Sequence, residues 1–234
     1  MSEHAALQEL LQAGVASLGL SFDDAQMKQI LGYLLAVLDE NQHVNVTAIR
    51  EPEAAVAQHL IDSLALVKVW NEHCSSKAPS TAFDLGTGGG FPAAVLAAAW
   101  PHCKVTAVDS TGKKVAVVER CSGLVGITNL TTLHARGAEL PALQPQFRQA
   151  FKLSTARAVG PAVKLLKELL PLTSRHGWIL LMKGPEVTGS EFRAAQRLAE
   201  KRDFIALDPI SYSVPNVGDR TILPYRGNRV PVSE

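Results

Sequence analysis

The chain has 234 residues, 47% of them apolar and 19% charged, with a net charge of +1. This composition predicts a soluble globular protein large enough for one α/β domain with an extension. It contains no run of eighteen uncharged apolar residues and no secretory signal in its first twenty residues, so we expect a cytoplasmic protein that is not anchored in a membrane. The three cysteines lack C-x-x-C or neighbouring histidine spacing, which argues against a disulfide framework and against a metal site.

The two halves of the chain differ in charge. Residues 1–103 contain 4 Lys and Arg against 11 Asp and Glu, a net charge of −7, whereas residues 104–234 contain 19 against 11, a net charge of +8. Such asymmetry indicates a positive face in the second half that can meet phosphates, although scattered surface lysines and arginines would give the same count.

The first 78 residues predict a helical extension packed on the rest of the chain. Leucines from Leu7 to Leu18 recur at helical spacing, a second helix begins near Asp23 and Asp24, and a third comes after Pro52. The polar segment 74–80 predicts the connection between this extension and the second part of the chain.

From Ser80 onward, the pattern alternates between strands and helices, which predicts a doubly wound parallel sheet of seven strands within one unit, residues 79–234. The predicted strands are 81–85, 104–108, 130–134, 151–156, 177–182, 203–211 and 220–225. The predicted helices are 91–100, 112–125, 160–171 and 188–201. Segment 137–150, with two prolines, leaves little room for a long helix.

A glycine loop comes directly after the first predicted strand, in the sequence AFDLGTGGGFP over residues 82–92. A strand, a glycine turn and a helix in this order bring backbone N–H groups close to a cofactor. Asp84, Gly86, Gly88 and Gly90 form D-x-G-x-G-x-G, whereas the dinucleotide fingerprint requires glycine at the position of Phe91. This spacing disfavours an NAD oxidoreductase.

Two acidic residues indicate which cofactor the loop binds. Asp84 would repel a pyrophosphate but suits an ammonium or sulfonium group, and S-adenosylmethionine carries both cations and no phosphate. Asp109 ends the next predicted strand, where it can hold both hydroxyls of a ribose. The sequence therefore predicts an S-adenosylmethionine site; the alternative is an ordinary glycine-rich turn that binds nothing.

Other polar residues stand where a doubly wound sheet places its ligands, at the carboxyl ends of strands. Ala138 and Glu139 could flank an adenine. Arg157 and Lys183 close the fourth and fifth predicted strands, where an unpaired buried charge is costly.

Three further residues have both an ordinary and a functional interpretation. Lys113 and Lys114 open a helix at the end that disfavours cations, which indicates an anionic partner, but they equally fit a solvated helix surface. His59 alone is typical of a core histidine held by Asp62 or by a helix cap.

Eight motifs in order give the chain a specific resemblance over about residues 30–225: NVTAIRE, HLIDSL, FDLGTGGGFP, VDSTGKK, HARGAE, STARAV, LMKG and GDRTIL. Together they resemble the glucose-inhibited division B family, the ribosomal RNA small subunit methyltransferases G. The resemblance implies a class I S-adenosylmethionine-dependent methyltransferase with a Rossmann-like sheet. It also implies N7 of a guanine in 16S rRNA, guanine 527, as the acceptor in the small ribosomal subunit. We expect a monomer.

The resemblance also carries over residue by residue. Family cofactor positions correspond to Gly86, Phe91, Ala138, Glu139 and Arg157. Polar family positions that face the RNA or the methyl-transfer site correspond to Asn45, His59, Lys113, Arg136, Lys183 and Arg220.

The chain departs from the family pattern at two places. The family usually continues its loop as F-P-G-I-P-L, whereas here Ala93 comes after Pro92, and Glu40 replaces an aromatic residue before the N-x-T motif. Neither change removes a charged ligand.

Guanine N7 carries an in-plane lone pair and no proton, so its methylation needs no general base, and catalysis rests on positioning the two reactants. We therefore expect no indispensable acid or base. Arg136, Lys183 and Arg220 would hold the RNA and Arg157 would brace the cofactor pocket.

Two alternatives remain open: a methyltransferase for a non-RNA acceptor, and an inactive RNA-binding module with the cofactor fold. A cysteine-dependent cytosine methyltransferase is disfavoured because no cysteine stands in a Pro-Cys motif.

Overall fold

The computed structural model describes residues 3–157, 160–185, 187 and 189–228. Residues 158–159 of the STARAV motif and residue 188, the predicted start of the last helix, lie outside the described residues. The helices are α1 (Glu3–Ser17), α2 (Asp24–Glu40), α3 (Pro52–Ala55), α4 (Asp62–Val69), α5 (Ala93–Ala99), α6 (Gly112–Leu124), α7 (Leu140–Leu143), α8 (Ala162–Leu169) and α9 (Gly189–Glu200). Two π-helical segments, η1 (Val56–Ile61) and η2 (Trp70–Cys74), and two 3-10 segments, η3 (Gly137–Glu139) and η4 (Pro145–Phe147), complete them.

The N-terminal helices form where the sequence predicts them. Asp23 caps α2 by accepting a hydrogen bond from the Gln26 N–H (2.8 Å), and the Gln26 side chain accepts one from the Asp23 N–H (3.1 Å). The amide nitrogen of Gln26 also donates to the Ala98 and Ala99 carbonyls at the end of α5 (3.2 and 3.0 Å). One side chain therefore fixes the start of α2 against the end of α5.

The sheet has eight strands among the described residues: β1 (Thr81–Leu85), β2 (Lys104–Asp109), β3 (Leu130–His134), β4 (Phe151–Arg157), β5 (Thr173–Lys183), β6 (Phe204–Ala206), β7 (Ile210–Val214) and β8 (Gly218–Gly227). The strand order is β3-β2-β1-β4-β5-β8-β6, and β7 also pairs with β8. The first five strands are parallel, whereas β8 is antiparallel to β5, β6 and β7.

Two sequence predictions about the sheet are therefore wrong. The sheet is mixed rather than parallel, and the predicted strand 203–211 is two strands that pair with different parts of β8. Pro209, which has no N–H to donate to a ladder, lies in the break between them. The prediction for segment 137–150 is confirmed, because α7, η3 and η4 have only three or four residues each.

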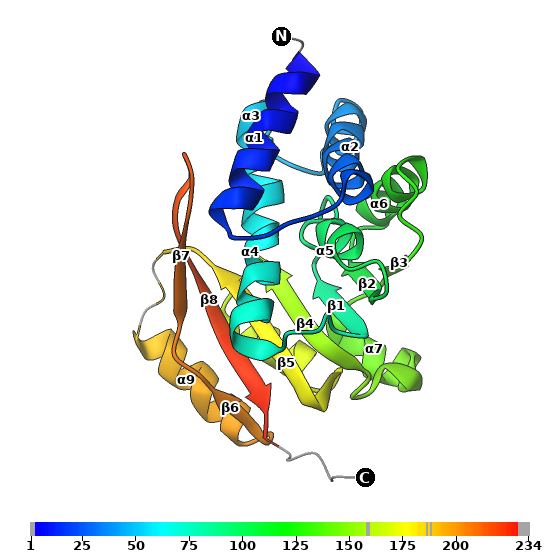
Figure 1. The fold of residues 1–234 in the computed structure, drawn as a ribbon. Coiled ribbons are helices and arrows are strands. Elements are labelled where there is room, and N and C mark those ends of the chain that lie inside the picture. The colour runs from blue at the N-terminus through cyan, green and yellow to red at the C-terminus, as the bar shows by residue number, and fades with distance from the viewer. Residues whose placement is uncertain (1–2, 158–159, 186, 188, 229–234) are drawn as a thin grey trace.

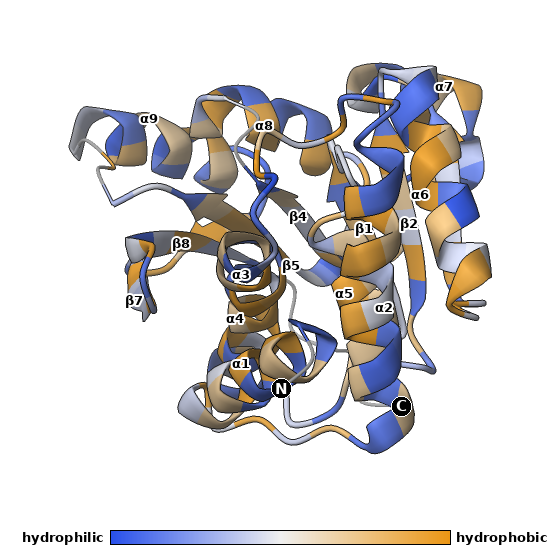
Figure 2. Cartoon of the chain, turned by 90° about the horizontal axis from the view of Figure 1, so that it is seen from above, coloured by the Kyte–Doolittle hydropathy of each residue, from blue (hydrophilic) through white to orange (hydrophobic). Residues whose placement is uncertain are grey.

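Helices cover both faces of the sheet (Figure 1). One hydrophobic cluster joins the N-terminal helices, α5 and α6 to one face, and a second joins α7, α8 and α9 to the other. Viewed from above, the two helical layers flank the sheet (Figure 2). The first cluster contains residues from both sides of the boundary that the sequence predicts between residues 78 and 79. The helical N-terminal part therefore shares its core with the sheet.

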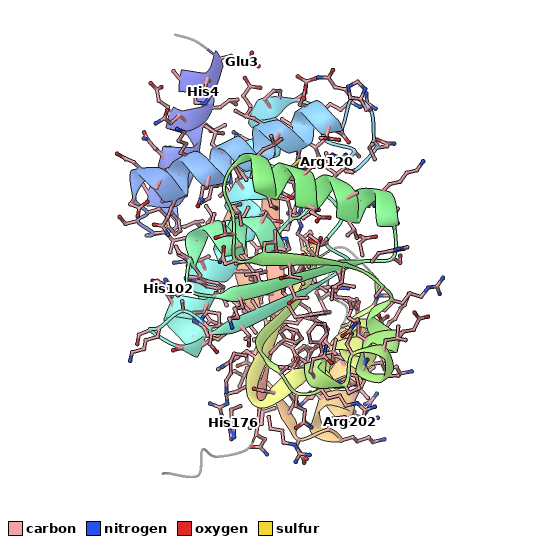
Figure 3. All side chains as sticks on the ribbon, turned by 90° about the vertical axis from the view of Figure 1, so that its right-hand side faces the viewer. Glu3, His4, His102, Arg120, His176 and Arg202 are labelled. Atoms are coloured by element: carbon pink, nitrogen blue, oxygen red, sulfur yellow. The ribbon has the colours of Figure 1, made fainter. Side chains whose placement is uncertain are left out.

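Glu40, one of the two departures from the family pattern, forms an ion pair with Arg120. The Glu40 carboxylate accepts hydrogen bonds from Arg120 Nε and Nη2 (2.9 and 2.6 Å), and this pair joins α2 to α6. Figure 3 shows Arg120 on α6 where that helix lies along α2. Ala93, which stands in place of the family glycine, is fully buried at the start of α5.

Candidate functional site

The glycine loop between β1 and α5 is a tight turn whose glycines are required by its backbone. Gly86, Gly88 and Gly90 have φ of 71°, 58° and 86°, the left-handed region that favours glycine. A Cβ on Gly90 would lie 1.8 Å from the hydroxyl oxygen of Tyr33 in α2, and that hydroxyl donates to the Gly89 carbonyl (2.9 Å). The N-terminal helices therefore hold the loop in shape.

The N–H groups of this loop are largely used within the protein. Those of Gly86 and Thr87 donate to the Val108 carbonyl, those of Gly90 and Phe91 to the Thr87 carbonyl, and that of Gly88 to Asp109 Oδ2. The expectation that the turn presents its N–H groups to a cofactor is thus wrong for these five, because three of them bond to the end of β2 and two to Thr87 within the turn. A loop without these free donors is a poor phosphate site, which agrees with the non-dinucleotide spacing.

Asp84 is the main unsatisfied group beside the loop. Its side chain is buried, and no described residue donates a hydrogen bond of normal geometry to either carboxylate oxygen. Burial raises the pKa of Asp84 to about 6, although the nearby Thr87 hydroxyl, Arg157 and the Ala93 N–H act in the opposite direction. The hydroxyl of Thr87 is likewise buried without a partner among the described residues. Asp84 is 1% exposed and does not line either of the two cavities at the strand ends, so its expected contact with a cationic group stays a prediction.

Asp109 lies at the end of β2 and organises the same loop. Its two carboxylate oxygens accept hydrogen bonds from the Gly88 N–H (2.9 Å) and the Thr111 N–H (2.8 Å). Each oxygen keeps a second lone pair, so the predicted ribose contact is compatible with this geometry.

A cavity of about 290 Å³, which we call the loop pocket, opens at the ends of β1, β2 and β3. Gly86, Asp109 and Ala138 line it together, as the sequence predicts for a cofactor site. Glu139 is exposed and does not line it; Glu168 of α8, which the sequence analysis missed, does. Arg136 also lines the loop pocket, and its expected role in RNA binding stays a prediction.

A larger cavity of about 630 Å³, which we call the arginine pocket, lies at the ends of β4 and β5. It is lined by Ile49, Gln58, His59, Asp62, Arg157, Gly160, Met182, Lys183, Gly184, Tyr212 and Arg220. Leu85 of β1 pairs with Ala156 of β4, so Gly86 and Arg157 end neighbouring parallel strands. The two pockets therefore lie at adjacent strand ends, the usual ligand position in such sheets.

Arg157 is the centre of the arginine pocket. Its Nη1 donates to the Gln58 carbonyl (2.9 Å) and to Asp62 Oδ2 (3.1 Å), and its Nη2 donates to His59 Nδ1 (3.2 Å). The other Asp62 oxygen accepts a hydrogen bond from the Tyr212 hydroxyl of β7 (2.7 Å). This network joins the end of β4 to η1 and to the extra strand β7.

The protonation of His59 is set by its neighbours. Arginine only donates, so His59 Nδ1 must accept, and the hydrogen lies on Nε2, which donates to Thr47 Oγ1 (2.8 Å). Burial and then the Arg157 charge lower the pKa of His59 to about 3, so the ring is neutral. It stacks on Phe91 with 4.5 Å between ring centroids, which makes Phe91 a buried support rather than an exposed contact. His59 is buried, as expected of a core histidine, but of the two expected partners Asp62 does not hold its ring nitrogens, which bond to Arg157 and Thr47.

The remaining predicted residues are dispersed. Lys183 and Arg220 line the arginine pocket; Lys183 donates to the Gly160 carbonyl (2.8 Å) and pairs with Glu191 (3.0 Å). Asn45 and Lys113 are exposed, and Lys114 is half-buried near the start of α6. Sequence reasoning missed Tyr212, which lies one residue beyond the predicted strand 203–211, and the direct role of Thr47 in holding His59.

The described residues contain no group of three or more His, Cys, Asp and Glu that could hold a metal ion. Within the same part of the chain, no helix has the length and apolar character needed to cross a membrane.

Comparisons with known proteins agree with this geometry. A family profile described as rRNA small subunit methyltransferase G matches residues 26–216. A protein of that name from Roseiflexus sp. (strain RS-1) is 34% identical over 205 residues, which cover 88% of this chain and 85% of the relative. Another from Bordetella petrii is 40% identical over 178 residues, 74% of this chain and 66% of the relative.

Solved structures show the fold. The fibrillarin pre-rRNA processing protein of Methanococcus jannaschii aligns with a TM-score of 0.53 at 14% identity, over 66% of this chain and 69% of its own. TrmN from Thermus thermophilus aligns with a TM-score of 0.53 at 14% identity, over 74% of this chain and 53% of its own. Together with the family match, these likenesses assign the sheet to the class I methyltransferase fold.

Proposed function

This chain belongs to the family of rRNA small subunit methyltransferases G, and we propose that it methylates N7 of a guanine in 16S rRNA, guanine 527 by family resemblance. Its cofactor is S-adenosylmethionine. The observation that carries the proposal is the pair of pockets at adjacent strand ends, one beside a buried unpaired acid and the other lined by arginine and lysine.

The residues around the glycine loop fit S-adenosylmethionine. Asp84 would hold its ammonium group, and Asp109 its ribose hydroxyls, while Gly86, Gly88 and Ala138 allow close approach. The bound cofactor supplies a methyl group activated by a sulfonium. No loop donor is needed for a phosphate, which this cofactor lacks.

The arginine pocket suits a nucleophile that needs no base. His59 Nδ1 accepts from Arg157 and its Nε2 donates to Thr47, so neither nitrogen is available to take a proton. Both Asp62 oxygens are bound by donors. Guanine N7 already exposes its lone pair, so the chain's task is to place that atom in line with the methyl group.

The cationic side chains of the arginine pocket would have two different roles, positioning of the pocket and recognition of the RNA. Arg157 is committed to the protein network and would brace the pocket. Arg220, bonded among the described residues only to the Asp219 carbonyl, and Lys183, released from Glu191, would donate to phosphates or to guanine O6. Asn45, Lys113 and Lys114 would contact the RNA outside the arginine pocket.

The proposal is tested by supplying labelled S-adenosylmethionine and undermethylated small ribosomal subunits, then digesting the rRNA to nucleosides. We expect labelled 7-methylguanosine. R220A should lower methyl transfer at least about tenfold with unchanged cofactor affinity. For R136A, lower methyl transfer with unchanged cofactor affinity would assign Arg136 to RNA binding, and lower cofactor affinity would assign it to the cofactor site. Protein that binds the cofactor yet labels no 7-methylguanosine would contradict the proposal.

A further inference from the structure

Strand β7 is an addition to the seven strands in the main path of the sheet, and it forms one wall of the arginine pocket. Along β7, Ile210 and Tyr212 are half-buried and pack on the core, whereas Ser211 and Ser213 are exposed. This period of two turns the ring of Tyr212 toward the pocket side of the strand.

Tyr212 lies directly opposite Arg220 in the antiparallel pair of β7 and β8. Directly opposed residues share one face of a sheet. The hairpin therefore presents an aromatic ring and a guanidinium side by side, and both line the arginine pocket.

The polar end of Tyr212 is already occupied. Its hydroxyl donates to Asp62 Oδ1 (2.7 Å), and Asp62 is fixed by Arg157. The hydroxyl hydrogen is thus already used, and the hydrogen bond holds the ring in one orientation. What the side chain offers the pocket is its aromatic surface.

Aromatic rings that line this pocket, within the described residues, come from His59 and Tyr212. One face of His59 is covered by Phe91, with 4° between the ring planes. A base drawn out of an RNA stack loses its neighbours, and proteins replace them with aromatic side chains.

We propose that Tyr212 is the platform on which the target guanine stacks while Arg220 beside it donates to the guanine edge or phosphate. This assignment rests on the proposed function and adds the residue that recognises the base. It requires the ring of residue 212, not its hydroxyl.

Two variants separate the ring from the hydroxyl. Y212F and Y212L both lose the hydrogen bond to Asp62, so they form a matched pair that differs in aromatic character. We expect Y212F, which keeps the ring but loses the hydrogen bond that orients it, to lower kcat/KM for small subunits about two- to tenfold, and Y212L to fall about ten- to hundredfold below Y212F. Cofactor affinity by calorimetry should stay within about twofold in both variants. Equal kcat/KM in Y212F and Y212L, or a loss of cofactor affinity in Y212L as large as its loss of transfer, would overturn the inference.

A second measurement needs neither a variant nor catalysis. Wild-type protein bound to undermethylated small subunits is irradiated with ultraviolet light, and crosslinked peptides are identified by mass spectrometry. A nucleotide attached to Tyr212 supports the inference, and its absence from recovered crosslinks that include other pocket residues overturns it. If the crosslink forms but no 7-methylguanosine is made, the proposed reaction fails and the stacking assignment stands.

Discussion

The loop pocket and the arginine pocket lie at neighbouring strand ends but are built in opposite ways. The loop beside the first is local in sequence, made from residues 84–91 and Asp109, and it leaves a buried acid without a donor. The second collects side chains from η1, α4, β4, β5, β7 and β8, and its central charges, Arg157 and Asp62, are already bound to each other. A buried acid without a donor disfavours its own charged form, whereas a pre-paired network holds its shape before any ligand arrives.

The largest effect should come from breaking the pre-paired network. Replacing Arg157 with methionine leaves Asp62 buried with only Tyr212 as its donor and removes the partner of His59 Nδ1. We expect a stability loss of about 3 kcal/mol in urea unfolding, together with loss of methyl transfer. D62N with intact Arg157 is the comparison, and a fully stable R157M protein would show that the network is dispensable.

The next largest effect on stability should differ between two glycines of the same loop, Gly90 and Gly88. G90A meets the Tyr33 hydroxyl at 1.8 Å in addition to its unfavourable φ, whereas a Cβ on Gly88 meets nothing within 4 Å. We expect G90A to lose about 3 kcal/mol and G88A about 1 kcal/mol of unfolding free energy. Cofactor affinity measured by calorimetry should nevertheless fall in G88A. Equal stability of the two variants would argue against the contact with α2.

Asp84 should show that its pocket is strained without a ligand. Because its folded pKa of about 6 lies above the unfolded value, the folded state binds the proton first, and stability falls as pH rises from about 4 to 6. D84N should therefore be more stable than the wild type at pH 7, by up to about 3 kcal/mol, with no difference below pH 4.

The same carboxylate should make cofactor binding depend on pH. Wild-type affinity is expected to weaken as pH falls through about 6, while D84N binds weakly at every pH. A D84N protein that retains wild-type affinity at pH 8 would remove Asp84 from the cofactor site.

His59 should give a smaller effect than Asp84, with the opposite dependence on pH. Its pKa of about 3 in the folded state lies below the unfolded value, so the unfolded chain takes up the proton first and stability falls as pH drops below about 6.5. Between pH 7 and pH 5 this group should cost about 2 kcal/mol, a loss absent from H59Q. The comparison of the two urea-unfolding profiles isolates the contribution of this side chain from that of Asp84.

The sequence predicts the loop side of the molecule well because its information is local. The spacing of the glycines within residues 84–91 identifies the turn. The succession of predicted strands and helices locates β1, β2 and α6 within one or two residues. The prediction of free N–H donors in the loop is wrong, since closure onto Val108 and Asp109 depends on β2.

The arginine pocket is less predictable because its contacts span long separations. The sequence places Arg157 at the end of β4, but its partners lie in a helix about a hundred positions earlier. The sequence prediction misses Tyr212 because the predicted strand runs across the polar break at Asp208 and Pro209 and ends at residue 211, one position too early. Distant pairing partners leave no periodic signal in the intervening sequence.

The amide of Gln26 sets a limit on how far the chain can be shortened. Its oxygen accepts from Asp23, and its nitrogen donates to both Ala98 and Ala99, so it fixes the beginning of one helix and the end of another. Removal of α1 would keep this connection but delete the buried residues Leu7, Leu11 and Val15, whereas truncation past Gln26 leaves the Ala98 and Ala99 carbonyls without this donor. A shortened version of the chain must therefore keep both α1 and α2, although these helices precede the sheet in the sequence, because the first supplies core residues and the second holds the end of α5.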